Sequence, residues 1–560
     1  MDYKRVTMKK NILLTFILFL SVIAAAAHER PLSEKQKRAL AVMAARNPKT
    51  TVQDSQLQVV MEDDFLTVMT DGSQFAIIAN DDNFPAVVGY ADGAFSTENS
   101  SLTWFLNAAK ESMAQQLANG TPLRTAIAPD ASKFQTSIQP LLNTTWNQEE
   151  PYNNMCPKAS NGKAYPSGCV ATALSQIMKY HAFPTHGIGE KQYSFQPSEG
   201  SGELLYANFG ATTYDWDNML NNYTSGGYTE EQGNAVATIM LHCGVAVEMN
   251  YTPTGSGAYS SEACNGLVQF FGYNENVGIV YRNYYSLEQW MNMVFTELNM
   301  SRPVYYAGSD SSRGGHAFVI DGYDEDGLVH VNWGWGPDGG NGYYDISLLN
   351  PTGYQFSNSQ NMLIGIDLPT ADIKYESHLV SDYALSVSKT GKLLNVRVGQ
   401  SIWNLNGGAW EGDLAVILEG EGQTYELSRG TVSQTANLHD VLANISKSIN
   451  GMLKLPTDIA DGTYRLYVGA KSSRDERWQL VRRGELANSY LIEVSSGSVS
   501  TVTSDTDDQW VPTYVRNIST TKPAGNTAVY DLQGRRISEA STSSLQKGIY
   551  VKDGKKFIAK

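Results

Sequence analysis

The feature that most constrains the fold is an apolar helical pattern with a cysteine at its start, in PSGCVATALSQIMKYH at positions 166–181. Apolar residues recur there at i, i+3, i+4, i+7 and i+8, the stripe of a buried helix: Val170, Ala173, Leu174, Ile177 and Met178. Gly168 permits a sharp turn into this helix, so Cys169 falls in its first turn. The helix dipole and the free N–H groups at that end favour a thiolate, and so a nucleophile. An inert core cysteine is the alternative.

A second pattern predicts a β-hairpin that opens with a histidine. The segment 314–336 contains an apolar strand, an acidic turn and a returning strand. This pairing brings His316 near Asn332 and Trp333. An imidazole that works with a thiolate needs an orienting group on its second nitrogen; the Asn332 amide can supply it, and Trp333 can shield that hydrogen bond from water. Taken singly, His316 is equally a core histidine and Trp333 a packing residue.

A third pattern, NTTWNQ at 143–148, places Gln148 upstream of the cysteine. A glutamine there can donate a side-chain N–H to an oxyanion, with the backbone N–H of Cys169 as the second donor. By itself Gln148 is also compatible with a surface loop. The specific signal is the order of the residues: a glutamine, a cysteine at a helix start, a histidine on a strand, then Asn-Trp.

Three of these segments together resemble one known family: GCVATA at 168–173, GGHAFVIDG at 314–322 and HVNWGWG at 330–336. They are similar to the streptopain family of papain-like cysteine peptidases. Stretches at 214–217, 244–251 and 302–306 match as well, so the resemblance covers about residues 60–368. It implies an α+β fold whose catalytic domain, residues 131–368, is papain-like and two-lobed.

The resemblance also implies roles for individual residues. Cys169 would be the nucleophile and His316 the general base. Gln148 would lie in the oxyanion hole, and Asn332 and Trp333 would support the imidazole. A bulky hydrophobic residue two positions before the scissile bond would be preferred, with a contribution from the segment 249–257. No glycine-rich phosphate-binding pattern stands out, so we expect no cofactor.

An inhibitory propeptide, removed by proteolysis, is a further implication of the resemblance, and residues 28–130 fit it. Residues 75–79 and 86–90 read as two strands, and the apolar spacing from Leu102 to Met113 predicts a helix. The turn-rich stretch that follows is an exposed connector, and we expect cleavage between Arg124 and Lys133.

Beyond the catalytic domain the pattern changes to short alternating strands. Residues 369–495 are predicted to form an immunoglobulin-like β-sandwich, followed by a Ser/Thr/Asp-rich linker at 496–527. The final segment, 528–560, resembles the C-terminal sorting signals of type IX secretion and would then be trimmed on export. An ordinary edge β-hairpin is the alternative.

Composition and the first residues limit the possible functions. A chain of 560 residues suffices for about three or four folded units. Its net charge of −15 makes a nucleic acid a poor partner. Residues 1–27 have the basic start, apolar run and small-residue end of a secretory signal peptide, with a retained membrane anchor as the alternative. We expect an exported protein with no membrane span.

The other three cysteines carry weaker signals. Cys156, Cys243 and Cys264 lack paired metal-ligand spacing, so we expect no zinc site. Cys243 and Cys264 can form a disulfide after export, although the sequence does not show it.

We therefore predict a secreted cysteine endopeptidase made as a zymogen. Its partners would be protein or peptide substrates and its own propeptide, which acts as an intramolecular inhibitor. Two alternatives remain: a Cys–His acyl transferase, which passes the acyl group to an amine instead of water, and a surface adhesin on a peptidase fold. A binding protein has no need of the cysteine, histidine, asparagine and glutamine together.

Overall fold

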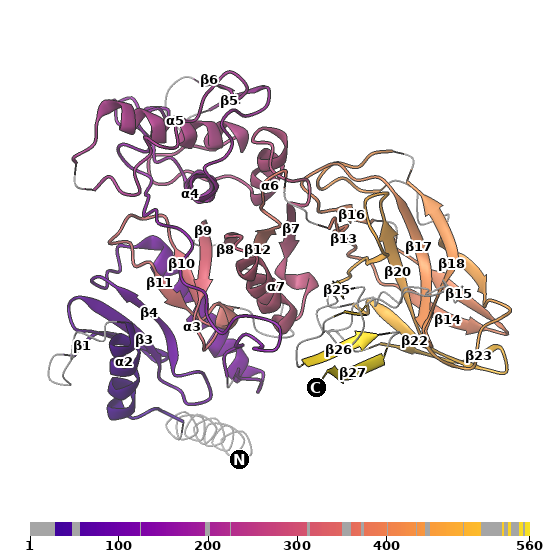
Figure 1. Cartoon of the computed structure of the whole chain (residues 1–560). Coiled ribbons are helices and arrows are strands. Elements are labelled where there is room, and N and C mark those ends of the chain that lie inside the picture. The colour runs from indigo at the N-terminus through magenta and orange to yellow at the C-terminus, as the bar shows by residue number, and fades with distance from the viewer. Residues whose placement is uncertain are drawn as a thin grey trace, which may run out of the picture. The chain divides into compact units, whose positions relative to one another are not determined.

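The computed structural model divides into two units, Met1–Thr513 and Tyr514–Lys560 (Figure 1). It describes residues 28–46, 57–123, 125–196, 202–224, 226–310, 314–349, 360–370, 374–399, 401–432, 434–442, 449–484, 486–505, 529–530, 536–538, 548–552 and 555–559. The expected signal peptide and Arg124 lie outside these ranges. No helix of the described part is long and apolar enough to cross a bilayer.

A ten-stranded antiparallel sheet organises the first unit. Its order is β1-β2-β3-β4-β11-β10-β9-β8-β12-β7. The strands are β1 (Gln58–Glu62), β2 (Leu66–Thr70), β3 (Gln74–Ala79), β4 (Val87–Asp92), β7 (Gly278–Tyr281), β8 (Val304–Asp310), β9 (Gly314–Tyr323), β10 (Val329–Asn332), β11 (Gly342–Tyr344) and β12 (Asn361–Ile364). The hairpin expected at 314–336 is β9 and β10, which confirms that prediction.

The region expected to be a propeptide contributes the first four strands of this sheet. Helices α2 (Leu32–Arg46) and α3 (Ser100–Ala118) cover the two faces of these strands. Side chains alternate between the faces along β3, so Ala76 and Ile78 pack with α2, whereas Phe75 and Ile77 pack with α3. The strands expected at 75–79 and 86–90 and the helix from 102 to 113 are present.

The sheet is continuous from this region into the rest of the chain because β4 pairs with β11. Gly342 makes the close approach possible, since a Cβ there would lie 2.4 Å from the carbonyl oxygen of Tyr90. The Tyr90 ring stacks on Tyr343 at 5.2 Å, and its hydroxyl donates to Asp324 at 2.8 Å. Backbone pairing and side-chain contacts therefore join the two segments.

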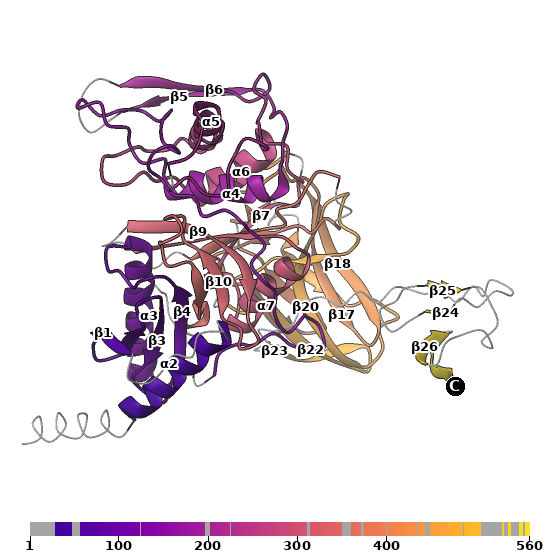
Figure 2. The same ribbon diagram turned by 60° about the vertical axis from the view of Figure 1, so that its left-hand side comes forward.

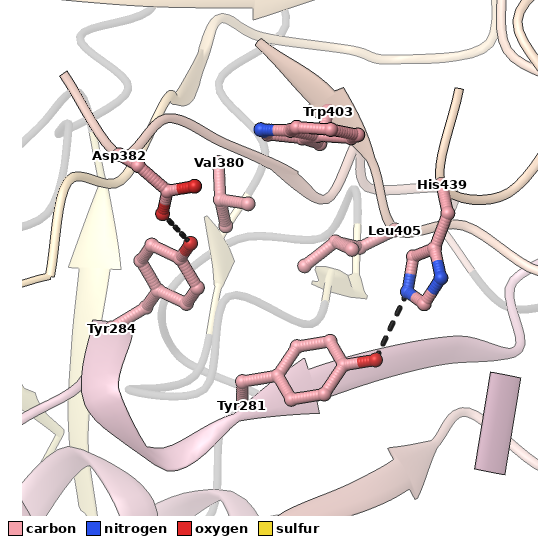
Figure 3. Close-up of a pocket in the computed structure, with 7 residues that line it drawn as sticks. All are labelled: Tyr281, Tyr284, Val380, Asp382, Trp403, Leu405 and His439. Carbon is pink, nitrogen blue, oxygen red and sulfur yellow. Dashed lines mark hydrogen bonds between the residues drawn. The ribbon is translucent and has the colours of Figure 1, made fainter. Parts of the chain in front are cut away.

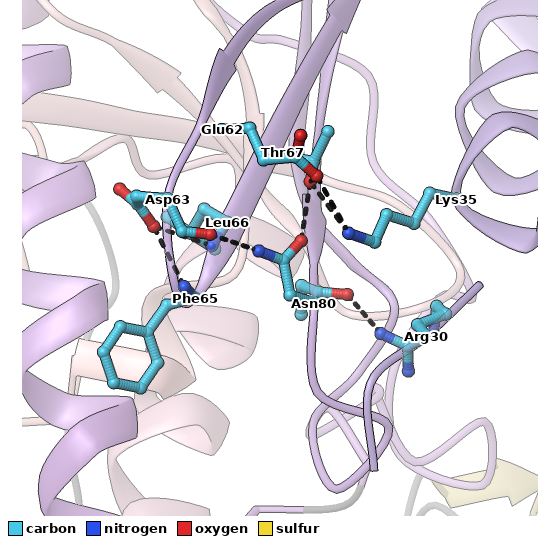
Figure 4. A network of polar contacts seen from close by, with 9 residues as sticks. Arg30, Lys35, Glu62, Asp63, Phe65, Leu66, Thr67 and Asn80 are labelled. Carbon is cyan, nitrogen blue, oxygen red and sulfur yellow. Dashed lines mark hydrogen bonds and ion pairs between the residues drawn. The ribbon is translucent and has the colours of Figure 1, made fainter. Parts of the chain in front are cut away.

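A buried polar network fixes helix α2 to the strands (Figure 4). Lys35 Nζ donates to Thr67 Oγ1 at 3.2 Å, and Thr67 Oγ1 donates to Asn80 Oδ1 at 2.6 Å. Arg30 donates to the carbonyl of Phe84 at 3.0 Å. Buried charged groups need hydrogen-bond partners, so this network favours one position of α2 on the strands.

Helices and a hairpin form a second layer above β8 and β9 (Figure 2). They are α4 (Cys169–His181), α5 (Glu230–Ala246) and α6 (Ser260–Gln269), with β5 (Glu190–Phe195) and β6 (Glu203–Asn208). Helix α7 (Leu287–Asn299) packs on the sheet itself, and the short 3-10 helices η2 (Arg282–Tyr284) and η3 (Ile346–Leu349) complete the region. The expected helix at 169–181 is confirmed, with its predicted apolar residues buried.

Residues 374–505 form further β-sheets around their own apolar core. The strands are β13 (Leu379–Val380), β14 (Ser386–Thr390), β15 (Leu393–Arg397), β16 (Trp403–Asn404), β17 (Asp413–Gly420), β18 (Gln423–Thr431), β19 (Gly451–Lys454), β20 (Gly462–Lys471), β21 (Gln479–Leu480), β22 (Ser489–Ser495) and β23 (Ser498–Ser504). We call this region the β-module. The boundary expected at residue 495 is wrong, because β23 pairs with β22 inside the segment assigned to the linker.

The β-module covers the β7 edge of the ten-stranded sheet. Ile279 of β7 donates its N–H to the carbonyl of Leu405 at 3.0 Å, and Gly407 donates to Val277 at 2.7 Å. Val380 and Leu405 belong to the same apolar core as the α4–α6 layer. The β-module is therefore joined to the preceding domain through both backbone and core.

The second unit contains a four-stranded sheet in the order β25-β24-β26-β27. Its strands are β24 (Val529–Tyr530), β25 (Arg536–Ser538), β26 (Gly548–Lys552) and β27 (Lys555–Ala559). They lie within the expected sorting segment.

Candidate active site

Cys169 is the first residue of α4, and Gly168 determines how the chain enters that helix. Gly168 has a φ of 92°, a conformation that favours glycine. A Cβ at this position would lie 2.7 Å from the Met249 side chain and 3.0 Å from the carbonyl oxygen of Ser256. Both backbone conformation and space therefore require glycine immediately before the cysteine.

The half-buried Cys169 thiol lies against strand β9. Burial raises the pKa of the thiol, while the backbone N–H groups of Ala317, Val170 and Cys169 itself act in the opposite direction. The contact with Ala317 places the sulfur beside the residue that follows His316. In this arrangement the thiol is protonated at neutral pH and needs a base to become a nucleophile.

His316 is buried on β9, where it pairs with Gly308 of β8. Burial lowers the pKa of its imidazole to about 4, so the ring is neutral at neutral pH. Its Nε2 lies 2.9 Å from the carbonyl oxygen of Trp333. Because a carbonyl only accepts, Nε2 carries the proton and Nδ1 has the free lone pair. Trp335 stacks on the ring at 6.1 Å.

The expected hydrogen bond between Asn332 and His316 is not formed in the described structure. Asn332 Oδ1 accepts from the N–H of Gly334 at 3.1 Å and from Gln176 at 3.2 Å. Its Nδ2 donates to the carbonyl of Thr144 at 2.8 Å. Asn332 therefore acts on the histidine indirectly: it shapes the turn whose Trp333 carbonyl holds the imidazole.

Gln148 and Trp333 are both buried. The Gln148 carbonyl accepts from the N–H of Ser167 at 3.0 Å, which brings it next to the segment that leads into Cys169. The Trp333 ring packs against Phe105 of α3 at 6.1 Å. The Gln148 backbone therefore lies next to the segment that enters α4, and the Trp333 ring lies 6.3 Å from that of His316.

Gln176 is a residue of the site that the sequence analysis missed. It is fully buried on α4, and its Oε1 accepts from Thr144 Oγ1 at 2.9 Å and from the N–H of Trp146 at 3.2 Å. The same amide bonds Asn332. A polar amide among the apolar residues of the helix was the available signal, since a buried amide needs several partners.

The remaining cysteines are unpaired and buried. Cys243 Sγ lies 3.3 Å from Ser175 Oγ, and the possible disulfide with Cys264 is not formed. Burial raises the pKa of Cys156 and of Cys243 to about 12. These thiols are core residues, in contrast to the half-buried Cys169.

A half-buried cysteine at a helix start beside a buried histidine defines the arrangement of a thiol-dependent acyl-transfer enzyme. The family described as the Peptidase C10 family matches residues 146–344. Streptopain of Streptococcus pyogenes is 33% identical over 316 residues, which cover 52% of this chain and 78% of streptopain. The thiol protease/hemagglutinin PrtT of Porphyromonas gingivalis is 34% identical over 346 residues, 56% of this chain but 39% of that protein.

A solved structure agrees with these relatives. A fragment of prointerpain A from Prevotella intermedia has a TM-score of 0.52 and 44% sequence identity, covering 56% of this chain and 98% of the fragment. The chain belongs to the peptidase C10 family, and it is a cysteine-type peptidase.

Proposed function

We propose that the chain is an exported endopeptidase, made as a zymogen, in which Cys169 is the nucleophile and His316 the general base. The observation that carries this proposal is the contact of the Cys169 sulfur with the N–H of Ala317, which places it beside a histidine whose Nε2 is already held by the Trp333 carbonyl. Nδ1 of His316 therefore keeps the lone pair with which a general base accepts a proton.

The chemistry follows from these positions. His316 Nδ1 takes the thiol proton, and the Cys169 thiolate attacks the peptide carbonyl. The backbone N–H of Cys169 and the side chain of Gln148 hold the oxyanion. The imidazolium then donates its proton to the leaving amine, and water activated by His316 hydrolyses the thioester. Asn332 and Trp333 keep the imidazole in place.

Residues 28–130 would keep the precursor latent. Strand β4 extends the catalytic sheet, and Phe105 of α3 packs on Trp333, whose carbonyl holds His316. The propeptide therefore contacts the element that positions the base. Cleavage between residues 124 and 133 would remove the propeptide and allow the turn at Trp333 to adjust around the substrate.

A hydrophobic preference two residues before the scissile bond is also part of the proposal. The Met249 side chain lies against Gly168, next to the nucleophile. Tyr305 lies close enough to Cys169 for the two to interact electrostatically, and its hydroxyl is 3.1 Å from Ser260 Oγ. Such apolar and aromatic side chains suit a bulky hydrophobic residue.

Two segments would direct export: residues 1–27 as signal peptide and 528–560 as sorting segment. Mass spectrometry of the protein recovered from culture medium tests both. We expect an N-terminus at His28 or later and loss of the final segment; recovery of the intact chain only inside cells contradicts this part of the proposal.

The activity is tested with purified precursor under reducing conditions, beside Cys169→Ala and the control Cys156→Ala. We expect wild type and the control to lose the propeptide and to cleave casein, whereas Cys169→Ala does neither. Casein cleavage by Cys169→Ala would show that Cys169 is not the nucleophile. An added amine acceptor separates the alternatives: amide products in place of free carboxylates would indicate a transferase.

A further inference from the structure

A pocket of about 250 Å³ lies where the catalytic domain meets the β-module (Figure 3). Tyr281 and Tyr284 come from β7 and η2, and the remaining lining residues come from the β-module. The volume is slightly below the roughly 300–1,000 Å³ of pockets for drug-sized ligands, so it suits a group the size of one side chain. None of the five expected catalytic residues lines it.

Aromatic rings form most of its walls. In Figure 3 the Trp403 ring lies over the pocket, Tyr281 lies opposite, and Tyr284 closes one side. Val380 and Leu405 form the apolar back wall. Rings therefore lie on three sides of the pocket, and aromatic rings attract cations that approach their faces.

The polar groups of the pocket are acidic or neutral. One oxygen of Asp382 accepts from the Tyr284 hydroxyl, and in Figure 3 the other oxygen points toward the space beneath Trp403. His439 Nε2 lies 2.9 Å from the Tyr281 hydroxyl, and burial lowers the pKa of His439, so the ring is neutral at neutral pH. Nothing in this lining repels a positive charge.

Arg482, the basic residue paired with Val380 of the lining, is engaged elsewhere. Arg482 pairs through its backbone with Val380. Its guanidinium lies 4.3 Å from the centre of the Tyr285 ring and donates to Gln289 at 3.2 Å, away from the pocket lining. Among the described lining residues, therefore, no basic side chain neutralises the second oxygen of Asp382.

We propose that this pocket binds an alkylammonium group, either the side chain of a lysine or a quaternary ammonium head group. A cation in this pocket can interact with both the aromatic rings and the Asp382 carboxylate. A neutral group of the same shape gains only apolar contact. Both domains supply walls, so the bound cation also bridges the catalytic domain and the β-module.

Two pairs of probes test this inference on full-length Cys169→Ala protein, which keeps the chain intact. Choline is compared with its neutral isostere 3,3-dimethylbutan-1-ol, and N-acetyl-lysine amide with N-acetyl-norleucine amide, by saturation-transfer NMR and calorimetry. We expect at least one cation to bind about tenfold more tightly than its neutral partner. The cation that binds better identifies the source of the group.

Variants locate the binding. Asp382→Asn keeps the shape of the side chain and an acceptor for Tyr284, so the fold is retained; it should weaken the cation about tenfold and leave the neutral isostere unchanged. Trp403→Leu should abolish binding, and Trp478→Leu, which alters a tryptophan outside the pocket, should not. Equal affinity for cation and isostere, or full affinity in Asp382→Asn, would overturn the proposal.

Discussion

The Nε2 atom of His316 lies 2.9 Å from the carbonyl oxygen of Trp333, on the returning arm of the same hairpin. The orienting group of the imidazole is thus a backbone atom, held by a turn. Asn332 stabilises that turn through Gly334, and Gln176 holds Asn332. Hydrogen bonds and the Trp333–Gly334 peptide therefore connect the helix that begins at Cys169 to His316.

Gln176→Leu should weaken catalysis by removing this support. It removes one partner of the Asn332 amide and the acceptor of the Thr144 hydroxyl, so we expect kcat to fall roughly 10- to 100-fold with little change in KM, and stability to fall by roughly 1–3 kcal/mol. Steady-state kinetics on processed enzyme provide the measurement. The control Gln269→Leu changes an exposed residue of α6; an effect on KM alone in Gln176→Leu would argue against a role in positioning.

Gly168→Ala should abolish activity through the geometry of the nucleophile. The alanine adopts an unfavourable φ and its Cβ meets Met249 and the Ser256 carbonyl. Gly162 offers a matched control, since its φ is 80° but nothing lies within 4 Å of an added Cβ. We expect Gly162→Ala to lose roughly 1 kcal/mol of stability and to keep its activity. Full activity in Gly168→Ala would refute the account of that turn.

Buried histidines should make the protein less stable in mild acid. Burial lowers the pKa of His181 and of His242 to about 4, from 6.5. The unfolded chain therefore binds more protons between these values, and stability is lost as pH falls from about 6.5 to about 4. Between these pH values, urea unfolding should show that the free energy of unfolding of His181→Gln falls by roughly 2 kcal/mol less than that of wild type. The exposed His186→Gln should leave the pH dependence unchanged.

Removal of the β-module should destabilise the catalytic domain. Truncation after residue 369 uncovers β7 and takes Val380 and Leu405 out of a shared core. We expect a lower melting temperature and aggregation through the exposed strand edge. Truncation after Thr513 removes only the separate second unit and should leave melting unchanged. Equal melting of both truncated proteins would show that the β-module is independent.

Local periodicity and residue order were sufficient to predict much of this structure. The helix that begins at Cys169, the hairpin that carries His316 and the strands at 75–79 and 86–90 appear where the patterns place them. Each depends on apolar spacing within a few residues, which a sequence displays directly.

Features that depend on tertiary contacts were not predictable in this way. The hydrogen-bond partner of His316 is a main-chain oxygen, and the residue type does not determine the direction of a main-chain carbonyl. Strand β23 has the Ser/Thr composition of a linker, yet it pairs with β22 and buries Val499 in the core of the β-module. The partners of Gln176, Asn332 and Thr144, are distant from it in the sequence, so its polar character in an apolar helix could not say what it bonds.

The most direct test of the central claim is the rate at which iodoacetamide alkylates Cys169 at pH 6, followed by peptide mass spectrometry on processed wild type and His316→Ala. We expect Cys169 to react at least about tenfold faster in wild type, because His316 can take the thiol proton as the sulfur attacks, and casein cleavage to disappear in step with alkylation. Equal rates in the two proteins, or casein cleavage that survives complete alkylation of Cys169, would contradict it.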